Sequence, residues 1–239
     1  MKLDILAIAA HPDDVELGCA GTILAHLAKG DKVGILDLTR GELGTRGTPE
    51  IRLAEATDAA RVLGIHAREN AGIRDGFFRN DEAHQLQLIT YIRKYQPEIV
   101  LLNATEDRHP DHGRGGALIN DACFLSGLRQ IQTLDAHGEL QEPWRPKFLY
   151  HFIQDRYLKP DFIVDVTPHW NQKVAAIRAF RSQFFDPNSQ EPTSYISTPD
   201  FLDFVRARAE EMGHAIGVKY GEGFTTSRAL GVGSLWDLK

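Results

Sequence analysis

The stretch LDILAIAAHPDDVELG, residues 3–18, joins a short apolar run to a polar turn and the beginning of a helix. We predict a buried strand over Leu3–Ala10, because this run is apolar and is ended by Pro12. A helix over Val15–Lys29 follows, since its apolar residues recur on one helical face and Gly30 stops it. This order indicates a fold in which strands and helices alternate.

The alternation continues along the chain. Further strands or extended pieces are expected at Lys32–Leu38, Ala67–Ile73, Glu98–Asn103, Lys147–Phe152 and Phe162–Val166. Further helices are expected at Pro49–Leu63, Asp81–Tyr95, Asp111–Ser126, Pro168–Phe184 and Pro199–Ile216. Continuously apolar strands, rather than striped ones, are typical of a parallel sheet covered on both sides. The sequence therefore predicts the α/β class, with a Rossmann-like, mostly parallel sheet and helices on both faces.

We predict a single domain over residues 1–239, with an irregular C-terminal part from about residue 185 to residue 239. A chain of this length buries roughly 70–75% of its unfolded surface, which is enough for a substantial core. The segment Phe185–Pro199 is rich in Pro, Ser, Asn and Thr and is expected to be a long loop. The sequence leaves open whether this loop closes over a substrate.

Charge and hydropathy exclude several classes of partner. The formal net charge is −6 and no run of basic residues occurs, which argues against a nucleic-acid partner. No stretch reaches the ~20 apolar residues of a membrane span, and the first apolar run, interrupted by Asp4, is too short for a signal peptide. Cys19 and Cys123 form no CxxC motif and are expected to be buried and reduced. A cytoplasmic protein is expected.

The tripeptide His-Pro-Asp occurs twice, at residues 11–13 and 109–111, each time at or shortly after the end of a predicted strand. One such motif is often only a turn followed by a helix N-cap. Two of them, each followed directly by another Asp or His, favour a shared site, because ligands bind beyond the carboxyl ends of parallel strands. Imidazole nitrogens and carboxylate oxygens are the ligand set of a catalytic zinc site.

The residues AHPDDVE and HPDH resemble motifs of the LmbE-like, or PIG-L, superfamily of zinc-dependent N-deacetylases, which act on N-acetylglucosamine conjugates. The resemblance also covers TRGELGTRGT (39–48), IRLAEA (51–56) and GVKYGEGF (217–224). Within the superfamily, the chain is most similar to the bacillithiol-pathway branch, which acts on N-acetylglucosaminyl malate. Val15 departs from the usual Ala-His-Pro-Asp-Asp-Glu, but it follows the positions that carry the chemistry.

The resemblance implies a role for each matching residue. It makes His11, Asp14 and His112 metal ligands and Asp13 the general base. It implies that His109 supports the oxyanion or protonates the leaving amine, that Asp111 orients His109 or tunes its pKa, and that Arg52 and Tyr195 face the substrate. Family members are often trimers or hexamers, so a homo-oligomer is expected.

This residue set suits amide hydrolysis. Bound zinc lowers the pKa of its water to about 7 and polarises a carbonyl, and a carboxylate and a protonated histidine can move the protons. A ligating histidine also needs an acceptor for its other ring N–H, and Glu16 or Asp37 is expected to serve. The same ligands accept Fe²⁺ and other divalent ions, so the metal stays open.

Four arginines, at positions 40, 46, 52 and 108, fall near the same predicted sheet edge and suggest an anionic substrate such as a malate conjugate. We expect Arg108 to bind the anion and Glu42, in a glycine-rich loop, to bind a sugar hydroxyl, although that loop is nearly as well explained as a plain connection. Other conjugates remain as alternatives: a chitooligosaccharide, a mycothiol precursor or an antibiotic conjugate. A non-catalytic α/β module that binds metal or a nucleotide is the remaining alternative.

Overall fold

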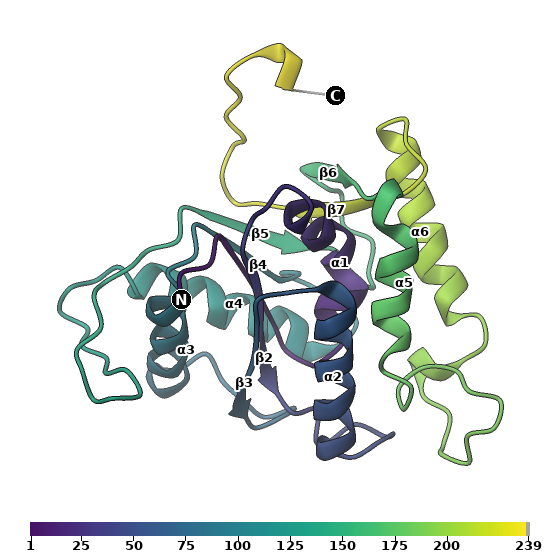
Figure 1. Ribbon diagram of the computed structural model, residues 1–239, viewed down its shortest axis with the longest axis horizontal. Coiled ribbons are helices and arrows are strands. Elements are labelled where there is room, and N and C mark those ends of the chain that lie inside the picture. Colours follow the sequence, from purple (N-terminus) through teal and green to yellow (C-terminus); the bar gives the residue numbers. More distant parts are fainter. Residues whose placement is uncertain (238–239) are drawn as a thin grey trace.

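Seven strands form one sheet in the computed structural model, which describes residues 1–237 (Figure 1). The strands are β1 (Ile5–Ala9), β2 (Val33–Thr39), β3 (Ala67–Ile73), β4 (Ile99–Asn103), β5 (Phe148–Phe152), β6 (Phe162–Asp165) and β7 (Gly221–Thr225). Their order is β3-β2-β1-β4-β5-β7-β6; β7 runs antiparallel to both β5 and β6, and the other neighbouring pairs are parallel. The predicted α/β class with a mostly parallel sheet is confirmed.

Helices cover both faces of the sheet. They are α1 (Asp14–Leu27), α2 (Pro49–Leu63), α3 (Glu82–Tyr95), α4 (Pro110–Leu125), α5 (Trp170–Arg178) and α6 (Phe201–Ala215). One face packs against α3 and α4, and the other packs against α1, α2 and α5 (Figure 1). Successive strand residues point to opposite faces, so Leu6 and Ile8 of β1 join the first core while Ile5 and Ala7 join the second. This explains why β1 is apolar at every position.

The C-terminal part differs from the prediction. It contains α6, at the predicted helix Pro199–Ile216, and also the unpredicted strand β7, so it is less irregular than expected from residue 185; residues 238–239 lie outside the described chain. Strand β7 was missed because Gly221 and Gly223 have low strand propensity. Both glycines are needed for close packing, since an added Cβ would lie 2.6 Å from Ile163 at one and 2.7 Å from Met212 at the other.

One predicted helix is also too long. Pro168–Phe184 was expected to be helical throughout, but α5 ends at Arg178 and the chain then turns. Phe180 and Phe184 are buried in the core after this turn, which explains why the apolar pattern continues beyond the helix.

The sheet has a switch point between β1 and β4. From β1 the chain builds β2 and β3 on one side and then crosses to β4 on the other side. The two strands end level with each other, with Ile8 opposite Leu102, and the side chain of Asn103 accepts a hydrogen bond from the backbone N–H of Ala10 at 2.8 Å. Open α/β sheets bind ligands at such a point, beyond the carboxyl ends of the strands.

Two smaller predictions also have outcomes in the fold. Cys19 and Cys123 are buried and not in a disulfide, as expected. Within residues 1–237, every helix is too short or too polar to cross a membrane.

Candidate metal centre and active site

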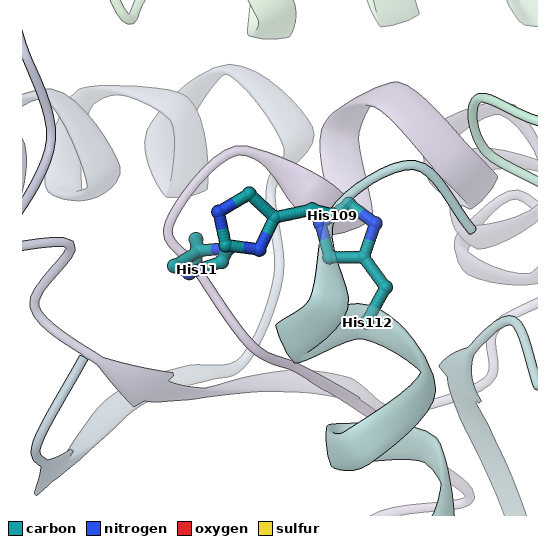
Figure 2. A group of neighbouring side chains, drawn as sticks. All are labelled: His11, His109 and His112. Atoms are coloured by element: carbon teal, nitrogen blue, oxygen red, sulfur yellow. The ribbon is translucent and has the colours of Figure 1, made fainter. Parts of the chain in front are cut away.

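The two His-Pro-Asp motifs meet at the switch point of the sheet. His11 follows β1, whereas His109 and His112 lie at the beginning of α4, and Figure 2 shows the three rings close together. The ring centroids of His11 and His109 are 4.7 Å apart, and those of His109 and His112 are 5.3 Å apart. The prediction that the motifs form one site is thus consistent with the geometry.

The Asp14 carboxylate lies between two of these histidines. Its Oδ1 is 3.1 Å from Nε2 of His112, and its Oδ2 is 3.5 Å from Nδ1 of His11. All three side chains are buried. Gln154 donates a hydrogen bond to Oδ1 at 2.7 Å, which holds the carboxylate in this orientation. Two imidazole nitrogens and one carboxylate therefore face one another.

The other ring nitrogens of these two histidines each contact a carboxylate. Nε2 of His11 lies 3.0 Å from Oδ1 of Asp75, and Nδ1 of His112 lies 2.6 Å from Oδ2 of Asp107. Histidines that bind metal usually donate their second N–H to such an acceptor, which fixes the tautomer and the ring orientation. Together with the Asp14 carboxylate between the two rings, this arrangement fits a divalent metal ion that keeps one coordination position open.

The expected acceptors, Glu16 and Asp37, do not contact the histidines. Both carboxylates instead bind Arg68, at 2.6 Å and 2.9 Å, in a buried ion-pair network. Asp75 and Asp107 were missed at the sequence level. Asp75 follows β3 and Asp107 stands two residues before His109, so both lie near carboxyl ends of strands, and this was the available signal.

Two other groups of side chains also bring ligand atoms together, within 4.8 Å of one another. The first combines His11, His109 and His112, and the second combines His11 with Asp75 and Asp111. We favour the set with Asp14 over the first group, because no carboxylate among the described residues is hydrogen-bonded to the His109 ring. We also favour it over the second group, because Nε2 of His11 is already in contact with Asp75 and Nδ1 of His11 faces Asp14.

The protonation of the cluster also fits cation binding. Burial lowers the pKa of His112, but the Asp14 charge and the hydrogen bonds to Asp107 and Asp14 raise it to about 9. Burial acts to raise the pKa of Asp14, but the charge of His112 and the bonds to both histidines hold it well below its usual range. Without metal, protons thus supply the positive charge between these groups, and metal binding releases protons from such ligands.

Asp13 has an unusual backbone conformation. Its φ of 113° lies in the left-handed region, which non-glycine residues rarely adopt. Its side chain is buried, makes no capping bond to α1, and lies 3.3 Å from Nη2 of Arg52. Burial raises the pKa of Asp13 to about 7, although the Arg52 charge opposes this shift. A carboxylate with a pKa near neutrality, beside the candidate ligands, is suited to accept a proton.

His109 is arranged as a hydrogen-bond donor toward the site. Its Nδ1 accepts the backbone N–H of Asp111 at 3.3 Å, so the neutral ring carries its proton on Nε2. Burial and the charges of His11 and His112 lower its pKa. A neutral imidazole N–H can polarise a carbonyl oxygen.

Among the described residues, the Asp111 carboxylate is not hydrogen-bonded to the His109 ring, but its charge acts to raise the pKa of His109, which was the alternative expectation. It accepts a hydrogen bond from the backbone N–H of Gly76 and one from Arg114, both at 2.8 Å, and it lies 3.6 Å from Nε2 of His11. The backbone N–H of Asp111 contacts the His109 ring, whereas the Asp111 carboxylate binds Gly76, in the loop after β3, and Arg114 of α4.

Arg52 and Glu42 both make contacts within the protein, and their expected roles toward the substrate stay predictions. Arg52 is buried, and its guanidinium donates to the carbonyls of Pro12 and Gly41 as well as contacting Asp13. Glu42 is exposed but accepts the backbone N–H of Asp75 at 2.8 Å, which ties the glycine-rich loop to the partner of His11.

Arg108 and Tyr195 form an exposed pair next to His109. The Arg108 guanidinium lies 4.0 Å from the centre of the Tyr195 ring, and both residues contact Asp155, at 3.5 Å and 3.4 Å. Of the four arginines, Arg46 does not face the site, because it is buried and bound to Ser182 and the loop before Tyr195. Arg108 is the exposed arginine next to His109, whereas Arg52 is buried against Asp13.

Fold and site together define an α/β protein with a histidine–carboxylate centre at the switch point of a parallel sheet. The PIG-L family model, described as GlcNAc-PI de-N-acetylase, matches residues 6–123. The solved structure of the conserved protein TT1542 from Thermus thermophilus is 36% identical, with a TM-score of 0.85, and the match covers 97% of this chain and 98% of that one.

Two relatives with an assigned reaction are also similar. The structure of N,N'-diacetylchitobiose deacetylase from Pyrococcus horikoshii is 30% identical, with a TM-score of 0.77, over 92% of this chain and 82% of that one. The diacetylchitobiose deacetylase of Thermococcus kodakarensis is 29% identical over 190 residues, 75% of this chain and 70% of that protein. The chain belongs to the PIG-L family, also called LmbE-like.

Proposed function

We propose that this protein is a metal-dependent N-deacetylase that hydrolyses the acetamide of an N-acetylglucosamine conjugate. One observation carries the proposal: the Asp13 carboxylate lies beside a buried histidine–carboxylate centre that does not need it as a ligand. Membership of a family of de-N-acetylases supports the same reaction. A module that only stores metal would have no use for the strained, costly conformation of Asp13.

The candidate ligands are His11, Asp14 and His112. When bound there, a divalent ion such as zinc or iron supplies Lewis-acid activation of the acetamide carbonyl and of water. Asp13 takes a proton from the attacking water, and Nε2 of His109 donates its hydrogen bond to the carbonyl oxygen as negative charge develops. The C–N bond then breaks, and the proton held by Asp13 passes to the departing nitrogen. Acetate and the free amine are the products.

We further propose that the part of the substrate beyond the sugar carries a carboxylate, as in N-acetylglucosaminyl malate, and that Arg108 binds it. Arg108 is adjacent to His109, its side chain is 41% exposed, and its only ion pair among the described residues is the 3.5 Å contact with Asp155. A planar guanidinium held on an aromatic ring is well suited to bind a carboxylate. The second candidate is a neutral second sugar, which the similarity to two diacetylchitobiose deacetylases favours.

One experiment tests both the proposed reaction and the proposed substrate. Release of free amine is measured from N-acetylglucosaminyl malate, diacetylchitobiose and N-acetylglucosamine, with metal-loaded protein and with chelator-treated protein. Metal-dependent release supports the deacetylase, and its absence with all three substrates refutes it. We expect Arg108→Ala to raise KM at least tenfold for the malate conjugate only, and Arg156→Ala, an exposed neighbour paired with Glu106, to leave KM unchanged. A preference for diacetylchitobiose, or equal effects on all substrates, would discard the malate conjugate.

A further inference from the structure

An arm, residues 226–237, follows β7 and extends away from the sheet and helices (Figure 1). Its tip, Ser234–Asp237, includes a short 3₁₀ turn. Leu235 is 81% exposed and Trp236 is 93% exposed, so two large apolar side chains point into solvent at the end of the arm. Tryptophan buries about 150–250 Å² where it is covered, and an uncovered one forgoes this stabilisation.

The tip is an ordered turn rather than a loose end. Oδ2 of Asp237 accepts hydrogen bonds from the backbone N–H groups of Gly233 and Ser234, both at 2.9 Å. Oγ of Ser234 accepts the N–H of Trp236 at 3.1 Å. These bonds shape the backbone turn that carries Leu235 and Trp236, and preorganisation of the backbone lowers the entropic cost of binding.

A groove of about 770 Å³ lies between the C-terminal end of α4, the beginning of β5 and the base of the arm, residues 226–231. Two aromatic side chains in it are exposed, Phe124 by 57% and Phe148 by 40%. The Arg145 guanidinium lies 4.2 Å from the centre of the Phe124 ring, and that of Arg228 lies 5.9 Å from the Phe148 ring. Within residues 1–237, neither arginine has a carboxylate within 4.0 Å.

Tip and groove are complementary in both apolar character and charge. The tip carries an indole, a leucine side chain and the Asp237 carboxylate, whereas the groove has two aromatic rings and, among the described residues, two guanidinium groups without carboxylate partners. Tryptophan and arginine are among the residues that most often dominate binding energy at interfaces. Residues 226–231, at the base of the arm, line the groove, and the rest of the arm extends away from the sheet and helices (Figure 1).

We propose that the arm tip, residues 234–237, docks into the groove of a second copy of this chain. Reciprocal exchange of two arms makes a dimer, and exchange in one direction around an axis closes a ring. The groove lies at the opposite end of α4 from the candidate metal centre, since Phe124 is about 18 Å along the helix from His112 at 1.5 Å per residue. Docking therefore leaves the catalytic residues of each copy complete.

The test is the mass of the full-length protein in solution, measured by sedimentation or by chromatography with light scattering at micromolar concentration. We expect a multiple of the 26.7 kDa chain for the wild type. Trp236→Ala is expected to weaken assembly by about 30-fold or more, as for a buried tryptophan at the centre of an interface. Arg145→Glu is expected to weaken it too, because the new carboxylate repels Asp237.

Controls separate this contact from others. Phe204→Ala removes an exposed aromatic side chain from α6 and is expected to leave the mass unchanged. Mixing Trp236→Ala, whose groove is intact, with Arg145→Glu, whose arm is intact, is expected to restore a complex of two copies. A monomeric wild type, including one whose arm folds onto its own groove, overturns the proposal. An oligomer that both substitutions leave unchanged also overturns it, and circular dichroism verifies that each variant is folded.

Discussion

Replacing Asp13 by Asn is expected to stabilise the metal-free protein while abolishing most of its activity. Burial raises the pKa of Asp13 from 3.8 to about 7. Three pKa units, at 1.36 kcal/mol each, correspond to roughly 4 kcal/mol that the ionised carboxylate costs the folded state. Asn keeps the shape and also tolerates a left-handed backbone, so the substitution removes the charge without adding strain.

The pH dependence of this effect has a definite sign. Because the folded pKa is higher than the unfolded pKa, the cost is absent below about pH 4, where Asp13 is protonated in both states. It grows between pH 4 and pH 7 and is complete above about pH 7. The stability gain of Asp13→Asn is therefore expected to be full at pH 8 and lost at pH 4.

Thermal unfolding of chelator-treated protein measures the first half of this prediction. For a chain of this size, 1 kcal/mol corresponds to about 2–4 °C, so the melting temperature is expected to rise by up to roughly 8–16 °C at pH 8. Asp200→Asn, an exposed position at the beginning of α6, is the control and is expected to change it little. An unchanged melting temperature of Asp13→Asn at pH 8, or an equal rise at pH 4, would refute the inference that the buried, ionised carboxylate destabilises the folded state.

Steady-state kinetics measures the second half. Loss of a general base typically lowers kcat by about 10²–10⁴-fold. A metal-loaded Asp13→Asn variant that keeps kcat within tenfold of the wild type would show that Asp13 is not the base, whatever its effect on stability.

Two further predictions separate metal ligation from substrate contact. Asp107→Asn weakens the acceptor of a ligand histidine and is expected to lower metal affinity about 10–100-fold in a competition with a chelator, whereas unchanged affinity would contradict the role assigned to Asp107. His109→Gln is expected to lower kcat about 10²–10³-fold with full metal content, because it removes a donor to the carbonyl oxygen. Loss of metal from that variant would instead place His109 among the ligands.

The alternation of strands and helices, and the position of the two His-Pro-Asp motifs at one sheet edge, could be predicted from sequence patterns. Both follow from local rules, since continuous apolar runs form buried parallel strands, and the carboxyl ends of such strands share one edge. Six of the seven strands and all six helices were located this way, whereas β7 was not, because its glycines are selected by contact with α6 and β6.

The tertiary structure alone decided which side chains pair. The sequence did not predict that Arg52 pairs with Asp13, and Glu16, which was expected beside a histidine, binds Arg68. Asp75 and Asp107 take the place next to the histidines. A buried charged side chain is oriented toward a group that neutralises it, because an unpaired buried charge is costly. In this protein that group lies on another strand, helix or loop. Local sequence patterns do not contain this information, because it depends on how the elements pack.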